Sequence, residues 1–279
     1  MNYKIIKKTI GTNAVETLGE IRSIDKIKDI IYTNDYGLVY SAGSNIGRFF
    51  EGKNEFPWFT ANKNFGFLSG LTYCEQKNEM YFAENAGKSI HSARMFDFDI
   101  TKYVNGADEI EINRMLKKTD NEAMCLLLSD NYGSLFICFD NIFKCFLYRR
   151  GIFHEYAGDG GSRFSVGCSP HNTSIGRISD MSKYKGKIIL SSEKQNVVRS
   201  IDENEIKVIF GDCKKNTVYR PSLIEIVKNN MYVLCDDKIY SYSFSHNRFN
   251  EIPSYESQNI YGITSDKEKF LFLLESVNE

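Results

Sequence analysis

The chain has 279 residues, of which 42% are hydrophobic and 25% are charged, and its formal net charge at pH 7 is −1. This composition is that of an ordinary globular protein and excludes a disordered chain. The balanced charge lacks the basic excess that is typical of nucleic-acid-binding proteins, so we expect no nucleic-acid partner. The 17 Tyr and 20 Phe favour strands, whose half-buried surfaces suit aromatic side chains.

The chain opens with two strand candidates, Tyr3–Thr9 and Val15–Leu18, on either side of a polar turn. After them one phrase recurs six times: a strand, a tight polar turn, and a second strand that ends in small or acidic residues. The second strands of the six copies begin at Leu38, Met80, Leu135, Ile188, Met231 and Phe270. Four-stranded propeller blades run to roughly 40 to 50 residues, so this repeat fits a propeller with insertions in two blades.

Strands can be assigned within the copies from apolar runs and turn residues. The expected strands are Ile27–Thr33, Leu38–Ser41 and Ile46–Phe50 in the first copy, Gly70–Cys74, Met80–Ala83 and Ser89–Ala93 in the second, Ile175–Met181, Lys187–Ser191, Asn196–Ile201 and Ile206–Phe210 in the fourth, and Leu223–Val227, Met231–Leu234 and Lys238–Phe244 in the fifth. Residues 106–122 could form a short helix. We expect instead an insertion between the second and third copies that contains one strand, Glu109–Asn113.

The sixth copy supplies only two strands, Ile260–Thr264 and Phe270–Leu274. The N-terminal pair matches the two strands that it lacks, and joining them would remove an exposed sheet edge. We therefore predict an all-β fold: a six-bladed β-propeller in a single domain, with its last blade closed by the N-terminal strands. The expected blades are residues 23–62, 63–118, 119–163, 164–214, 215–256, and 257–279 together with 1–22.

Residues 156–213 carry the most specific stretch. Tyr156–Gly161 reads Tyr-Ala-Gly-Asp-Gly-Gly, a strand and an Asn-containing corner at Asn196 follow, and the unit closes on Val208–Asp212. This stretch resembles an NHL repeat, although Lys-Gly stands where that family usually has an Asp-Gly turn. The resemblance implies a diverged NHL-like propeller. Because the family includes protein-binding modules, RNA-binding modules and some extracellular enzymes, the resemblance leaves function open.

Seven cysteines occur at irregular spacing and without a Cys-x-x-Cys pair. This pattern argues against a disulfide framework or a zinc site, and we expect buried, reduced thiols. The first residues, Met1–Lys8, lack the apolar stretch of a secretory signal. No segment approaches the roughly 20 apolar residues that span a bilayer. The sequence therefore predicts a cytoplasmic protein with no membrane span.

In a propeller, the loops that join second to third strands surround one mouth of the central channel, which is the usual binding site. A carboxylate or carboxamide stands at each of these corners. The candidate mouth residues are Asn45, Glu84, Asn85, Asp140, Asn141, Glu193, Asn196, Asp236 and Asp237, with His171, Asn172 and Asp180 at the start of the fourth copy. Such a mouth would attract a cation or a basic partner. Alternatively, Asn and Asp stand here as turn residues that bond their own backbone.

Calcium would need oxygen ligands from several blades, for which Asp29, Asn172 and Asp180 are the candidates. The Glu-Gly-Pro segment usual in calcium lactonases is absent from the chain. We expect no cofactor, with calcium as the alternative.

Two other groups of polar residues are weaker signals. The four histidines, His91, His154, His171 and His246, stand in different copies, and we expect solvated loop histidines. The short basic pairs Lys7-Lys8, Arg149-Arg150 and Lys214-Lys215 indicate solvated hairpin ends.

These observations favour a non-catalytic scaffold that binds a protein or another macromolecule at the channel mouth. Two alternatives stay open: a channel-centred hydrolase, lactonase or lyase, and a structural component of a larger assembly. A carboxylate cluster around an ion would favour the enzyme, whereas a broad apolar or aromatic patch would favour the binding module.

Overall fold

The computed structural model describes residues 1–12, 14–23, 25–60, 64–116, 124–130, 132–163, 169–211, 220–236, 238–252 and 259–277, with the side chains of residues 106–108, 111 and 115 left out. These residues form two compact units. Unit 1 is Met1–Asn64 with Pro221–Glu279, and unit 2 is Phe65–Arg220. Within the described residues each unit contains three antiparallel sheets of four strands.

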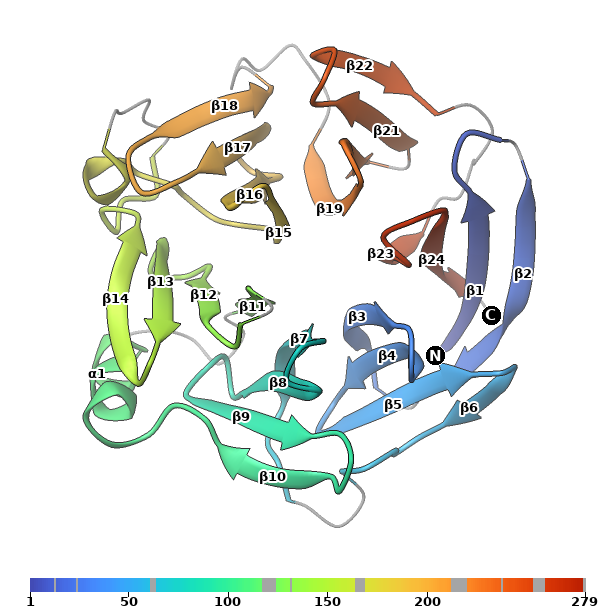
Figure 1. Cartoon of the computed structure of the whole chain (residues 1–279), viewed down its shortest axis with the longest axis horizontal. Coiled ribbons are helices and arrows are strands. Elements are labelled where there is room, and N and C mark those ends of the chain that lie inside the picture. The colour runs from blue at the N-terminus through green and yellow to red at the C-terminus, as the bar shows by residue number, and fades with distance from the viewer. Residues whose placement is uncertain are drawn as a thin grey trace. The chain divides into compact units, whose positions relative to one another are not determined.

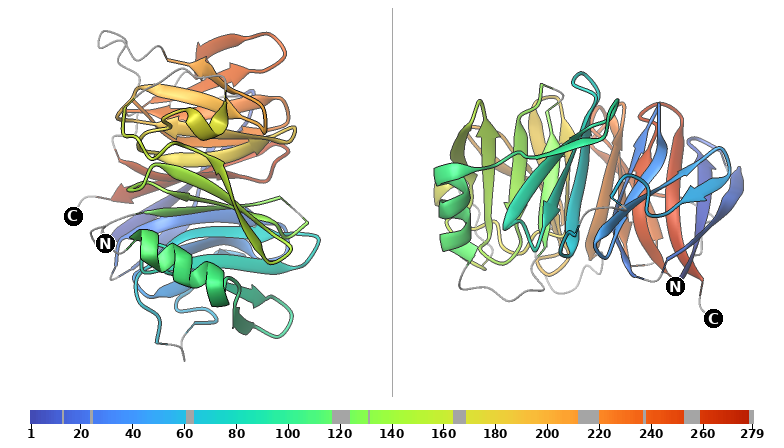
Figure 2. Two further views of the ribbon diagram at one scale, coloured as in Figure 1. Left: turned by 90° about the vertical axis from the view of Figure 1, so that its left-hand side faces the viewer. Right: turned by 90° about the horizontal axis from the view of Figure 1, so that it is seen from below.

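Unit 2 is continuous in sequence, and in each of its sheets neighbouring strands are consecutive in the chain (Figure 1). Its sheets consist of β7 (Leu68–Cys74), β8 (Glu79–Glu84), β9 (Ser89–Arg94) and β10 (Asp99–Lys102); β11 (Cys125–Ser129), β12 (Leu135–Phe139), β13 (Lys144–Arg149) and β14 (Ile152–Ala157); and β15 (Asp180–Tyr184), β16 (Lys187–Ser192), β17 (Val197–Ile201) and β18 (Ile206–Phe210). A helix, α1 (Gly106–Leu116), lies at the outer edge of the unit beside β14, and a short 3₁₀ helix, η1 (Pro170–Asn172), precedes β15 (Figure 2).

Unit 1 is assembled from both ends of the chain. Its sheets consist of β3 (Ile27–Thr33), β4 (Gly37–Ala42), β5 (Asn45–Phe50) and β6 (Lys53–Glu55); β19 (Pro221–Val227), β20 (Asn230–Cys235), β21 (Lys238–Ser243) and β22 (Arg248–Glu251); and β23 (Ile260–Ser265), β24 (Phe270–Val277), β1 (Asn2–Thr9) and β2 (Val15–Arg22). In the last sheet β1 pairs with β24 along its whole length, from Asn2 opposite Val277 to Thr9 opposite Phe270. The predicted all-β fold of six blades, with the last blade closed by N-terminal strands, is confirmed. The assignment to a single domain stays a prediction.

The position of a strand in its sheet explains its composition. All six residues of β4 and all five of β12 are buried, because second strands are covered on both faces. The fourth strands are more exposed than the second strands, as in β6, whose three residues are all exposed. Adjacent sheets within a unit are also joined through their first strands. The Thr72 hydroxyl accepts from the Ser129 amide at 3.1 Å, and the Thr264 hydroxyl accepts from the Tyr32 amide at 3.0 Å.

Two expected strands are wrong. The strand predicted at Glu109–Asn113 is the middle of α1, whose Ile112 and Leu116 are buried in the core shared by the first two sheets of unit 2. These two residues are one helical turn apart, so a helix places both on the core. The strand predicted at Ile175–Met181 begins only at Asp180. Ile175 and Ile178 are buried in the next core without joining the ladder.

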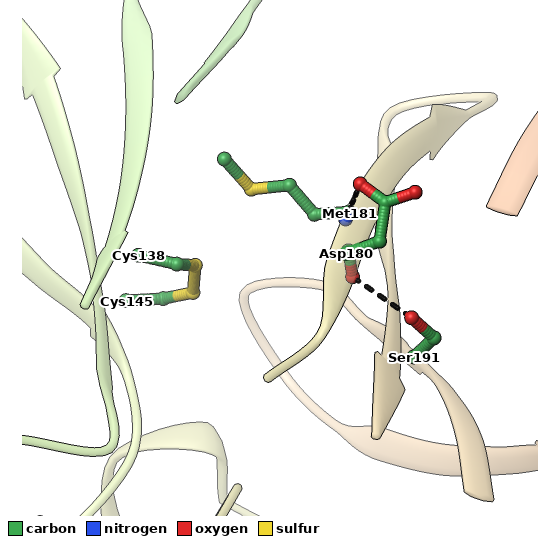
Figure 3. Close-up of a disulfide and its surroundings, with 5 residues drawn as sticks. All are labelled: Cys138, Cys145, Asp180, Met181 and Ser191. Carbon is green, nitrogen blue, oxygen red and sulfur yellow. Dashed lines mark hydrogen bonds between the residues drawn. A yellow bond between two sulfur atoms is a disulfide. The ribbon is translucent and has the colours of Figure 1, made fainter. Parts of the chain in front are cut away.

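The prediction of reduced cysteines is wrong for Cys138 and Cys145, which form a disulfide (Figure 3). They lie opposite each other on β12 and β13, with Cα atoms 4.2 Å apart, so the two thiols meet across the ladder. The Met181 side chain points toward this disulfide from β15. Cys74, Cys125 and Cys235 are buried free thiols, as predicted. Cys168 and Cys213 lie outside the described residues.

The basic pairs differ in their surroundings. Lys7 is partly exposed and pairs with Glu16, but the Lys8 side chain is buried at 2% exposure, so the prediction of a solvated pair is wrong for Lys8. Arg149 and Arg150 are exposed at a hairpin end, as predicted. Lys214 and Lys215 lie outside the described residues. Among the described helices, none has the length and apolarity that crossing a membrane requires.

Candidate functional site

The predicted corner residues of unit 2 lie at the ends of β8, β12 and β16, and each corner carries one carboxylate. These are Glu84, Asp140 and Glu193. In all three the carboxylate bonds to backbone amides or to basic side chains of the protein itself.

Glu84 ends β8 and is bound on both oxygens. Its Oε1 accepts from the Gly66 amide at 2.6 Å, and its Oε2 lies 3.0 Å from His91 Nε2. His91 lies on β9, stacked on Phe82 at 5.3 Å between ring centroids, so the prediction of a solvated loop histidine is wrong for this residue. Asn85 follows in the left-handed conformation (φ 51°), which suits a turn asparagine.

Asp140 follows β12 and is the most buried of the three carboxylates, at 3% exposure. It accepts from the Met124 amide at 2.9 Å and from Arg177 Nε at 3.1 Å. Burial raises the pKa of Asp140 even though both of these donors favour the ionised form. Both amide atoms of the neighbouring Asn141 are shielded from solvent and have no hydrogen-bond partner among the described residues.

Glu193 follows β16 and forms an ion pair with Arg220. Asn196, with φ 54°, accepts the Arg220 amide on its Oδ1 at 2.9 Å. The corner is therefore fastened to the end of unit 2 from two sides.

The remaining predicted residues lie apart from these three corners. In unit 1, the Asn45 Oδ1 accepts from Thr60 at 3.2 Å, and Asp236 occupies a left-handed turn with φ 51°. Asp237 lies outside the described residues. In unit 2, the Asp180 carboxylate accepts from the Met181 amide at 2.8 Å and points away from the disulfide (Figure 3).

His171 and Asn172 are exposed on η1. Elsewhere His154 is exposed on β14, and His246 in the β21–β22 turn contacts the Ser243 hydroxyl at 3.1 Å, both as solvated positions predict. In the described part of the chain, no three His, Cys, Asp or Glu side chains gather in a way that could hold a metal ion. The corner residues thus act in the turns themselves, and their expected role in binding stays a prediction.

A different surface of unit 2 combines exposed apolar and basic side chains. We call it the hairpin face: the turns β7–β8, β9–β10, β11–β12 and β13–β14, represented by Lys77, Phe96, Tyr132, Arg149, Arg150 and Ile152. Phe96, Tyr132 and Ile152 are 71%, 74% and 55% exposed. The first two turns are joined by a 3.0 Å bond from the Met95 amide to the Asn78 carbonyl.

A pocket of about 440 Å³ opens on the hairpin face. Its lining includes three cations and three tyrosines from the β7–β10 and β11–β14 sheets: Lys77, Arg149, Arg150, Tyr103, Tyr132 and Tyr148. The volume is in the range of ligand pockets. Sequence reasoning missed this site because Lys77 and Arg149 belong to different repeats and no local motif connects them.

The chain matches no known family model and no curated protein. Its architecture does match solved structures over nearly the whole chain. The fold is that of a six-bladed β-propeller. One similar structure is a catalytically inactive virginiamycin B lyase from Staphylococcus aureus with quinupristin, at 15% identity and a TM-score of 0.57, covering 95% of this chain and 85% of that chain.

Two further propellers are similar. A chain of a nidogen/laminin complex shares 11% identity at a TM-score of 0.62 and covers 94% of this chain and 97% of that chain. A streptogramin B lyase shares 15% identity at a TM-score of 0.53 and covers 99% of this chain and 98% of that chain. At such identities the likeness establishes a diverged propeller and leaves activity open.

Proposed function

We propose that this propeller is a protein-binding module whose contact surface is the hairpin face of unit 2. The observation that carries the proposal is the exposure of Phe96, Tyr132 and Ile152 at the turn ends of two adjacent sheets. Large apolar side chains exposed together mark interaction surfaces. Aromatic residues and arginine are also the residue types enriched at protein interfaces.

Two further facts support binding at this surface. Arg149 and Arg150 lie beside Ile152 in the same turn, so apolar contact and charge are combined within one hairpin. One of the similar propellers was solved as part of a complex between two proteins, nidogen and laminin. A propeller of this kind can therefore present a surface to a protein partner, and the hairpin face is the surface that we assign to this role.

Photo-crosslinking tests the proposal. A photoreactive phenylalanine analogue placed at position 96 or 152 should give a discrete adduct with one cellular protein. The same analogue at Val208, which is 41% exposed on β18, is the control and should give none. With that protein purified, Phe96→Asp and Ile152→Asp should each weaken binding at least tenfold, or about 1.4 kcal/mol. Equal adducts from position 208, or unchanged affinity in both variants, would contradict the proposal.

A further inference from the structure

The pocket on the hairpin face carries positive charge that the protein does not neutralise. Lys77, Arg149 and Arg150 form no ion pair or side-chain hydrogen bond with any described residue. No carboxylate belongs to the described lining. Three cations that converge on one cavity without an acid repel one another, and an anion placed between them relieves that repulsion.

Two acids of the neighbouring strands and turns are engaged elsewhere, and Glu75 of the β7–β8 turn is exposed outside the described lining of the pocket. Asp130 Oδ1 accepts from the Tyr132 and Ser134 amides, each at 2.8 Å, and so holds the turn that presents Tyr132. Glu79 Oε2 accepts from the Tyr81 hydroxyl at 2.6 Å. Both carboxylates therefore serve the scaffold and leave the three cations of the pocket available for a ligand.

The tyrosines give the pocket aromatic walls. Tyr103 and Tyr148 meet edge to face, with ring centroids 5.4 Å apart, and Tyr132 stands exposed beside them. The Tyr103 hydroxyl donates to the Gly133 carbonyl, and burial raises the pKa of Tyr103 to about 12, so it adds no negative charge near neutral pH. A planar ring entering the pocket would meet aromatic side chains in arrangements that rings favour.

Backbone geometry fixes the cations in place. Arg150 and Gly151 have φ values of 53° and 76°, which gives the two-residue hairpin turn that sets Arg149 and Arg150 side by side. Gly133 has φ +85°, and any side chain there would collide with the ammonium group of Lys77. The lysine therefore lies directly over the turn that carries Tyr132.

We propose that this pocket binds a phosphorylated tyrosine side chain of the partner protein. The phosphate would accept hydrogen bonds from Arg149, Arg150 and Lys77, and the ring would lie against Tyr103, Tyr132 and Tyr148. A phosphate ester carries close to two negative charges near pH 7 and three acceptor oxygens. It therefore suits a pocket with three cations better than a ligand with a single carboxylate would. The identity of the carrier as a protein rests on the function proposed above.

Calorimetric titration of the full chain tests this inference. The probes are phenyl phosphate, inorganic phosphate, and one peptide in three forms that carry tyrosine, phosphotyrosine or phosphoserine. Phenyl phosphate and the phosphotyrosine peptide should bind at least tenfold more tightly than inorganic phosphate and the other two peptides. Binding should weaken as salt rises, because the cations are exposed.

Variants locate the site. Arg149→Gln and Arg150→Gln should each weaken phenyl phosphate binding about tenfold, as expected for the loss of one charge-assisted hydrogen bond. Lys207→Gln removes an exposed lysine from β18 and should bind like the wild type.

Three results would each overturn the inference. Phenyl phosphate could fail to bind saturably. Inorganic phosphate could bind as tightly as phenyl phosphate, or the phosphoserine peptide as tightly as the phosphotyrosine peptide. Lys207→Gln could weaken binding as much as the two arginine variants. The protein-binding proposal is judged separately, since Phe96 lies outside the described pocket lining, so that Phe96→Asp should weaken partner binding at least tenfold but leave the phenyl phosphate affinity unchanged.

Discussion

At the scale of single residues, Lys8 is a charged side chain in an apolar setting. It lies opposite Leu271 on β24, and on the same face of β1 Ile6 lies opposite Leu273. Ile6, Leu271 and Leu273 belong to one apolar core of unit 1. Lys8 Nζ has no hydrogen-bond partner among the described residues, and burial lowers its pKa.

Lys8→Met should therefore raise the free energy of unfolding, by about 1 to 3 kcal/mol at pH 7, because it removes a buried unpaired polar group and keeps an apolar chain. Since the folded pKa is lowered, the unfolded state binds the extra proton. The loss of stability that the buried Lys8 charge causes in the wild type is then largest below the folded-state pKa. It shrinks as pH rises toward the pKa of the unfolded state. Urea unfolding between pH 6 and pH 10 measures both effects.

Lys7→Met is the matched control for this substitution. Lys7 is partly exposed and lies 3.5 Å from Glu16, so its replacement should change stability by no more than about 0.5 kcal/mol. Equal effects of the two substitutions would show that Lys8 is solvated. So would a difference in unfolding free energy between Lys8→Met and the wild type that does not narrow as pH rises.

Sequence reasoning reached the corner residues but not their partners. The turn chemistry of Asn85 and Asn196 follows from residue type, and both have the left-handed backbone that such turns need. The partners of the corner carboxylates, in contrast, come from elements distant in sequence. Asp140 accepts a hydrogen bond from Arg177, and Glu84 accepts one from the Gly66 amide. Lys8 was misjudged because adjacent lysines at a strand end look the same whether the second one faces solvent or a core.

At the scale of elements, α1 allows a direct test of whether burial of its side chains, and not their residue type, determines their contribution to stability. Ile112 is 1% exposed in the core with Leu116, whereas Ile110, two residues earlier, is 70% exposed. Ile112→Ala should lower the free energy of unfolding by about 2 to 4 kcal/mol, since it leaves a cavity. Ile110→Ala should change it by less than about 0.5 kcal/mol. Chemical denaturation measures both, and equal effects would mean that the helix does not pack as described.

The same residues explain why α1 was predicted as a strand. Ile110 and Ile112 alternate with glutamates, which is the period of a half-buried strand. The signal for a helix is the spacing of Ile112 and Leu116. Leu116, however, lies outside the alternating segment Glu109–Asn113 from which the strand was predicted. Second strands such as β4 and β12 were predicted closely, because complete burial demands an uninterrupted apolar run. The start of β15 was missed because buried Ile175 and Ile178 imitate a strand without pairing.

At the scale of the whole molecule, the number of blades is readable from the sequence but the surfaces between sheets are not. Two unmatched strands at each end of the chain imply a shared sheet, and β1 and β24 do pair. The hairpin-face pocket draws Lys77 and Tyr132 from separate sheets. Its residues have no common spacing, so only the packed structure brings them together. The disulfide likewise needed the β12–β13 register before Cys138 could be matched with Cys145.

The shared sheet predicts how the chain responds to loss of its N-terminus. Deleting residues 1–18 removes β1 and exposes the β24 edge along its length, together with Leu274 and the core beside it. We expect the truncated chain to lose its cooperative thermal transition in circular dichroism, because a long apolar edge cannot remain unpaired in water. A circular permutant that joins residue 279 to residue 1 keeps the sheet. It opens at Gly52, an exposed turn residue where an added side chain would meet no neighbouring atom, and it should melt like the wild type. A truncated chain with the wild-type melting curve would mean that β1 does not close the blade.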